Sequence, residues 1–155
     1  MRYQFELDID APRDRVVELF LDPDNLQKWQ PDLVSFEQIG SGPPRQVGAK
    51  SKQVHRMGNR EVELTETITV YSPPEEFAAT YEAEGVWNLI NNRLTATPEG
   101  TTRWVLDSHF KCSNLIMKLV ALLLPGMFKK QTRTFMQRFK EFAEKHVREG
   151  ENVHP

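Results

Sequence analysis

The chain lacks most of the features by which composition alone identifies a class of protein. It has a single cysteine, Cys112, among 155 residues, so it cannot form an intramolecular disulfide and suits a reducing compartment. It also lacks a strong basic excess, since 20 basic and 22 acidic residues give a net charge of −2. Dedicated nucleic-acid binders usually carry such an excess. We therefore expect no nucleic-acid partner.

Long hydrophobic runs are also missing. The apolar run at residues 115–124 is about half of the ~20 residues needed to span a bilayer, and Lys118 interrupts it. The first residues alternate polar with apolar side chains at once, which does not fit a secretory signal. We expect a cytoplasmic protein with one domain over residues 1–148 and a frayed polar tail over 149–155.

The residues that bind metals or cofactors do not form a recognisable pattern. The four histidines have no ligand spacing and the one cysteine stands alone, so the sequence predicts no metal site. A nucleophile elbow, a phosphate-binding glycine loop and a dinucleotide fingerprint are all absent. We therefore predict no cofactor.

What the sequence does contain is a succession of strand patterns. Tyr3, Phe5, Leu7 and Ile9 alternate with polar residues, which is typical of a half-buried strand. Two short helices follow, one of about ten residues that contains Val16 to Leu21 and one over 26–29, and an aspartate of Asp22-Pro23-Asp24 is placed to cap the second. Further strands are predicted at 33–39, 49–57, 61–71, 77–85, 87–97 and 101–111, most of them separated by glycine or proline turns.

The last long segment, residues 113–147, has a helical pattern. Phe128, Phe135, Phe139 and Phe142 fall on one stripe of a 3.6-residue helix, opposite a charged face. We expect Phe139 and Phe142 to be core residues. Pro125 should bend or split the helix, because it removes a backbone donor and clashes with the preceding turn. This break would act either as a gate or as a fixed kink.

A run of strands followed by helix indicates an α+β fold. Several short motifs occur in a characteristic order, namely Ile9-Asp10-Ala11-Pro12, Asp22-Pro23, Trp29-Gln30-Pro31, Val47-Gly48, Pro73-Pro74 and Gly100-Thr101-Thr102-Arg103-Trp104. With the terminal helix, this order resembles the helix-grip fold of the START-like superfamily, which includes polyketide cyclases and dehydrases and pollen-allergen-like proteins. The resemblance implies a curved antiparallel sheet of about six to seven strands around a long C-terminal helix, with a cavity for an apolar ligand. It does not settle function.

Strand alternation selects the polar side chains that would face such a cavity. Ser51, Gln53 and His55 share one face of their strand, and Glu66 shares the apolar face of the next. The predicted inner polar set is Gln53, His55, Glu66, Tyr81, Asn92 and Ser108. The residues near the Pro125 break that we expect to line the pocket are Leu124, Met127, Phe128, Gln131 and Phe135.

Three functions fit these residues. The first is binding of a small hydrophobic molecule (a lipid, a quinone or a polyketide-like compound). The second is a cyclase or dehydratase in which His55 and Glu66 pair directly and, with Tyr81, supply acid–base groups. The third is a protein-interaction module of the chaperone-activator kind.

Two further alternatives concern single regions of the chain. Glu66 would otherwise face water, or bond Arg93 or Lys52, in a purely structural role. Residues 115–133 combine an apolar run with basic residues and would allow peripheral membrane contact.

Overall fold

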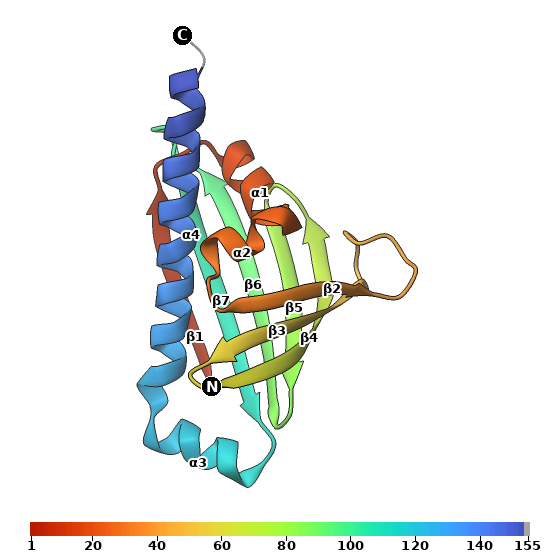
Figure 1. The fold of residues 1–155 in the computed structure, drawn as a ribbon. Helices are drawn as coiled ribbons and strands as arrows, with labels where there is room; N and C mark the ends of the chain where they lie inside the picture. The colour runs from red at the N-terminus through yellow and green to blue at the C-terminus, as the bar shows by residue number, and fades with distance from the viewer. Residues whose placement is uncertain (154–155) are drawn as a thin grey trace.

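The computed structural model describes residues 1–153, and in this part of the chain seven strands form one antiparallel sheet (Figure 1). The strands are β1 (Arg2–Ile9), β2 (Leu33–Ile39), β3 (Lys50–Met57), β4 (Arg60–Ser72), β5 (Glu76–Ala83), β6 (Val86–Ala96) and β7 (Thr102–Cys112). Their order is β1-β7-β6-β5-β4-β3-β2, a meander closed by the first strand. The predicted α+β helix-grip fold is confirmed.

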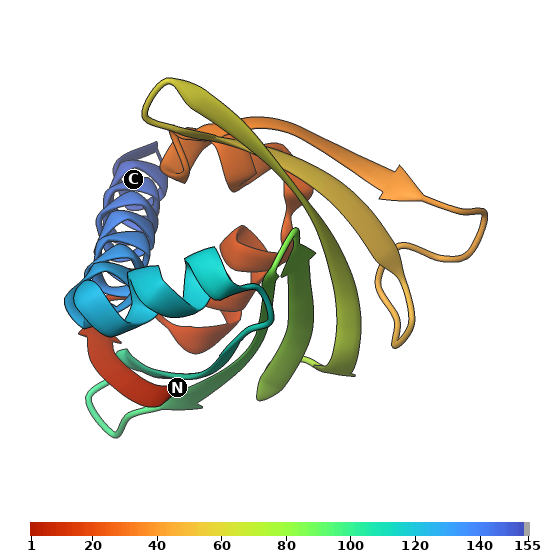
Figure 2. The ribbon, with the colours of Figure 1, turned by 90° about the horizontal axis from the view of Figure 1, so that it is seen from below.

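The helices lie on the inner side of the curved sheet. They are α1 (Arg13–Leu21), the 3₁₀ turn η1 (Pro23–Asn25), α2 (Leu26–Trp29), α3 (Leu115–Leu123) and α4 (Pro125–Val153). Figure 2 shows the sheet curling around one side of the molecule, with α4 along the other side. The Asp22 carboxylate accepts a hydrogen bond from the Asp24 amide at 2.9 Å and so caps η1. The predicted aspartate cap of α2 itself is not formed, because α2 follows η1 directly and has Asn25 at its N-cap without a side-chain bond.

The predicted terminal helix is split in two at the proline. Helix α3 ends at Leu123 and α4 begins at Pro125. Proline fits this position because the first backbone amide of a helix has no partner within the helix, so its absence costs no hydrogen bond. Asn114 caps α3, because its side-chain oxygen accepts from the Met117 amide at 2.8 Å. Helix α4 continues past the predicted end at Val147 to Val153, and residues 154–155 of the expected tail lie outside the described residues.

The core is an aromatic cluster between the sheet, α1, α2 and α4. Phe139 and Trp104 are fully buried, and their ring centroids lie 5.6 Å apart. Phe20 of α1 contacts both rings edge-on. Phe142 packs at the margin of this cluster. Both phenylalanines that the sequence assigned to the core therefore lie there.

Polar contacts fix α4 along its length. Near its start, the hydroxyls of Tyr3 and Thr132 lie 3.0 Å apart. Further on, the Glu144 carboxylate accepts from the Asp10 amide at 2.9 Å, and Arg138 pairs with Asp32 at 3.0 Å. Helix α4 is thus held to both ends of β1 and to the chain segment before β2.

Gly85, in the turn between β5 and β6, sets the position of α3. It has a φ of +77°, and a Cβ there would lie 2.1 Å from the side-chain nitrogen of Asn114. The Ser113 amide also donates to the Gly85 carbonyl at 2.9 Å. A side chain at residue 85 would therefore disturb both the turn and the cap of α3.

Candidate functional site on the inner face of the sheet

One row of side chains crosses the inner face of the sheet at the same level in five strands. From β7 to β3, each member is the direct register partner of the next: Phe110, Asn88, Tyr81, Glu66 and Ser51. Directly opposed residues on neighbouring strands point to the same side of a sheet. The Phe110 ring lies 4.4 Å from that of Phe128 in α4, so the row is on the side that faces the helix.

Glu66 receives the hydrogen bonds of this row. Its two carboxylate oxygens accept from the Ser51 hydroxyl and from the Gln53 amide nitrogen, each at 3.2 Å. If Glu66 had a purely structural role, we expected it to bond Arg93 or Lys52. Those two side chains instead bond Asp107 and Glu63. The half-buried carboxylate is therefore directed along the inner face.

Gln53 connects His55 to this carboxylate. The Gln53 amide oxygen lies 3.0 Å from His55 Nε2, while its amide nitrogen donates to Glu66. The expected direct pair of His55 and Glu66 is not formed, because the register places Val62 opposite His55 and Ser51 opposite Glu66. Since an amide oxygen only accepts, Nε2 carries the proton, and the neutral imidazole keeps a free electron pair on Nδ1.

The surroundings shift the pKa of two members of this group in opposite directions. Burial lowers the pKa of His55, and the negative charge of Asp32 partly opposes this. Burial, reinforced by the neighbouring Glu66 carboxylate, raises the pKa of Tyr81 well above its ordinary value. His55 is thus held as a neutral base, and Tyr81 as a phenol that can donate a hydrogen bond.

The other two predicted polar residues have partners inside the protein. Asn92 is buried, accepts from the Trp104 indole nitrogen at 2.9 Å and donates to the Phe77 carbonyl at 3.5 Å. It therefore satisfies a core tryptophan. Ser108 donates to the side-chain oxygen of Asn88 at 2.8 Å, which ties it to the row.

The five residues predicted to line the pocket near the Pro125 break are placed in different surroundings. Phe128 is buried against Phe110, and Phe135 stacks edge-on against Trp29 at 4.9 Å. Met127 is half-buried, whereas Leu124 and Gln131 are exposed to solvent. The structure thus brings the two phenylalanines to the inner side of the molecule.

Sequence reasoning did not select Asn88 or Trp29, and it placed Ser51 on the inner face without including it in the site. Asn88 continues the alternation of Ile90 and Asn92, so the period-2 pattern contains the signal for it. Trp29 is almost fully buried, and its indole nitrogen has no hydrogen-bond partner among the described residues. No sequence signal identifies this unpaired donor.

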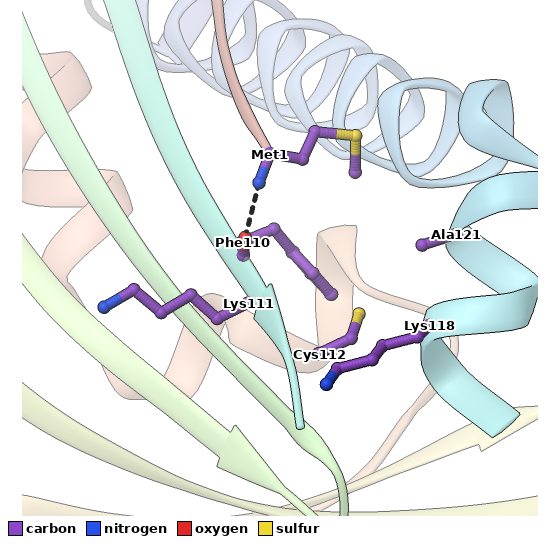
Figure 3. A pocket seen from close by; sticks show the side chains of 6 residues that line it. All are labelled: Met1, Phe110, Lys111, Cys112, Lys118 and Ala121. Carbon is purple, nitrogen blue, oxygen red and sulfur yellow. Dashed lines mark hydrogen bonds between the residues drawn. The ribbon is translucent and has the colours of Figure 1, made fainter. Parts of the chain in front are cut away.

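Two shallow hollows lie against α3 and α4, and neither is lined by Gln53, His55, Glu66 or Tyr81. One, of about 440 Å³, is lined by Met1, Phe110, Lys111, Cys112, Lys118 and Ala121, between the start of β1, the end of β7 and α3 (Figure 3). The other, of about 530 Å³, lies between β1 and α4. The first adjoins the row at Phe110, next to Phe128. Among the described residues, no group of three or more metal-binding side chains converges.

A family model described as "Polyketide cyclase / dehydrase and lipid transport" matches residues 2–144. The chain belongs to this family. None of the curated protein sequences matches it significantly. The superfamily that the sequence motifs resembled is therefore the correct one.

Solved structures share the fold of this family member at low sequence identity. An aromatase/cyclase from a Streptomyces species has a TM-score of 0.78 at 15% identity, over 95% of each chain. A conserved protein from Geobacillus kaustophilus has a TM-score of 0.76 at 16% identity, over 94% of this chain and 96% of that one. A norcoclaurine synthase from Thalictrum has a TM-score of 0.70 at 14% identity, over 95% and 96%.

Proposed function

We propose that the protein binds a small apolar or aromatic molecule, such as a lipid, a quinone or a polyketide-like compound, between the inner face of the sheet and α4. The observation that carries this proposal is the hydrogen-bonded chain His55–Gln53–Glu66–Ser51, with Tyr81 opposite Glu66. These polar side chains lie on the face that elsewhere forms the hydrophobic core. Family membership and the shared fold support the same interpretation.

The energetics favour a ligand role for this polar chain. Hydrogen bonds among Ser51, Gln53, His55 and Glu66 replace part of the solvation that these groups lose, but apolar side chains of similar shape would serve folding as well. An apolar ligand gains about 25 cal/mol per Å² of buried surface, and a few polar groups set its orientation. The unpaired donor of Trp29 would suit an acceptor group on the ligand.

The second candidate function is a cyclase or dehydratase. It needs His55, Glu66 and Tyr81 near one another. The bonds from His55 through Gln53 to Glu66, and the position of Tyr81 opposite Glu66, support this candidate. Neutral His55 would remove a proton from a substrate through Nδ1, and the Tyr81 phenol would stabilise or protonate the developing oxyanion. Glu66 would orient His55 through Gln53, and it would act on Tyr81 through its own charge.

Native mass spectrometry on gently purified protein tests the binding proposal, with solvent extraction to identify any bound compound. The test variant is the double substitution Gln53→Leu and Glu66→Leu. The matched control is Lys52→Ala with Glu63→Ala, because this 3.1 Å ion pair joins the same two strands on the outer face. Wild type and control should carry the same apolar compound, and the test variant should lose it. Equal retention by all three would contradict the proposed site.

A single-turnover assay with the extracted compound separates the two candidate functions. Conversion of that compound by wild type, but not by His55→Gln, would establish the enzyme. Recovery of unchanged compound from both would establish the binding protein.

A further inference from the structure

Helix α3 carries an apolar stripe that the described residues 1–153 leave uncovered. Its members are between 53% and 82% exposed: Leu115, Ile116, Leu119, Leu122 and Leu123. Leu124, just after the helix, is also exposed. No residue of α3 is buried. The fold itself therefore gains little from these side chains being large and apolar.

The stripe follows from the helical positions. Residues at i, i+1, i+4, i+7 and i+8 lie on one side of a helix. The opposite side, with Met117, Val120 and Ala121, is half-buried toward the protein. Helix α3 is thus held by one side and presents its more apolar side outward. An exposed patch of this kind marks a surface that contacts a partner.

The segment of chain that carries α3 has charge of one sign, and the acidic residue nearest to it is Glu84, beside Gly85 at the start of the helix. Between Asp107 and Glu141 the sequence has no acidic residue, while it has seven Lys or Arg; the rest of the chain has 13 basic and 22 acidic residues. Lys118 lies at the margin of the apolar stripe, and Lys129 and Lys130 follow in the first turns of α4, all exposed. A protein that is acidic overall is therefore basic along the segment that carries its exposed apolar helix.

We propose that α3 docks the protein on the surface of an anionic lipid bilayer, with the leucine stripe at the boundary of headgroups and acyl chains. The basic residues would contact the anionic headgroups. Figure 1 shows α3 at one end of the molecule, running across the axis of α4, where a flat surface can reach it. This proposal does not rest on the proposed ligand.

A second copy of the chain is a less suitable occupant. Pairing through α3 would bring the basic residues of two copies together, which is unfavourable. A helix of nine residues is about 14 Å long and about 10–12 Å wide. Its footprint is far below the ~800 Å² per partner of a stable protein interface. A bilayer needs no such matched area and supplies the opposite charge.

Vesicle cosedimentation of the full chain tests this proposal. The vesicles are pure phosphatidylcholine and an equimolar mixture of phosphatidylcholine and phosphatidylglycerol. The variant Leu115→Gln, Leu119→Gln, Leu122→Gln removes the stripe, and its exposed positions should leave folding unchanged by circular dichroism. The control Val34→Gln, Ile39→Gln, Met57→Gln changes three exposed apolar residues of the sheet.

Wild type and control should bind the anionic vesicles roughly tenfold more tightly than the neutral ones, and the stripe variant should lose this binding. The variant Lys118→Gln, Lys129→Gln, Lys130→Gln should bind the anionic vesicles roughly tenfold more weakly and show less dependence on salt. Failure of wild type to bind anionic vesicles would overturn the proposal, as would equal binding by the stripe variant. A solution dimer that the stripe variant dissociates would assign α3 to self-association instead.

Discussion

Tyr81 lies directly opposite Glu66 in the pairing of β4 with β5, and on the other side of Glu66 the Gln53 amide donates to the same carboxylate at 3.2 Å. A single carboxylate thus connects three strands on the inner face of the sheet. Through Gln53 it also reaches His55. This arrangement makes Glu66 the residue on which both candidate functions depend, and its electrostatic effect on Tyr81 can be measured.

Replacing Glu66 with Gln should lower the pKa of Tyr81, because the carboxylate next to the phenol disfavours the phenolate. The pKa should stay above the ordinary value of about 10, since burial is the larger cause of the shift. Ultraviolet titration of the phenolate band measures this, with Tyr81→Phe identifying the contributions of Tyr3 and Tyr71. An unchanged titration curve in the Glu66 variant would contradict the placement of the two side chains.

The stability of the protein should fall as the pH rises above about 10, in part through Tyr81. Its pKa is raised in the folded state, so above that pH the unfolded chain has lost a proton that the folded protein still holds. By linkage, the free energy of unfolding then decreases until the folded phenol also ionises. Urea unfolding of Tyr81→Phe across the same pH range should show a smaller decrease. Equal slopes for both proteins would contradict the shift.

His55 should reduce stability at mildly acidic pH. Its pKa is lowered by burial in the folded state, so below about pH 6.5 the unfolded chain binds a proton that folded His55 resists. The free energy of unfolding should therefore fall as the pH decreases through this range. His55→Gln should lessen the dependence. Urea unfolding of wild type and variant from neutral to acidic pH measures the difference, and equal dependence in both would contradict the shift.

Asn92→Leu should destabilise the protein by about 1–3 kcal/mol, because it leaves the buried Trp104 indole nitrogen without an acceptor. The control Arg93→Leu removes an exposed ion pair on the outer face and should cost about 1 kcal/mol or less. Denaturant unfolding gives both values. An Asn92 variant as stable as the control would show that this bond contributes nothing.

Phe135→Ala should weaken ligand binding and enlarge the space beside Trp29, since the two rings are in edge-on contact. An anionic aromatic dye, anilinonaphthalene sulfonate, serves as the probe in a fluorescence titration. The exposed Lys145→Ala is the control on the same helix. Lys140, also charged, suits this less well because it bonds Glu144 and the carbonyl of Asp8. Equal losses of dye binding in the Phe135 variant and the control would reject the assignment of Phe135 to the site.

Much of the fold could be predicted because burial follows periodicity. The alternation of Tyr3, Phe5 and Leu7 predicts β1, and the spacing of Phe139 and Phe142 predicts which side of α4 packs on the sheet. Pro125 predicts the split between α3 and α4 for a local steric reason.

The site could be predicted only as a face of the sheet. Alternation shows that Gln53 and Glu66 point inward, but hydrogen-bond partners depend on the register between strands, which alternation leaves open. For this reason the sequence suggested a direct pair of His55 and Glu66, where the structure inserts Gln53. Asn92 was expected in the site for the same reason, because its bond to Trp104 depends on the pairing of β6 with β7.

The most direct test of the central claim is amide chemical-shift mapping of the wild-type protein titrated with anilinonaphthalene sulfonate. We predict saturable shifts at inner-face residues such as Gln53, Glu66 and Tyr81 and in α4 near Phe135, with little change at outer-face positions such as Thr65 and Thr80. Shifts confined to the outer face or to α3, or no saturable shifts at all, would contradict a ligand site between the sheet and α4.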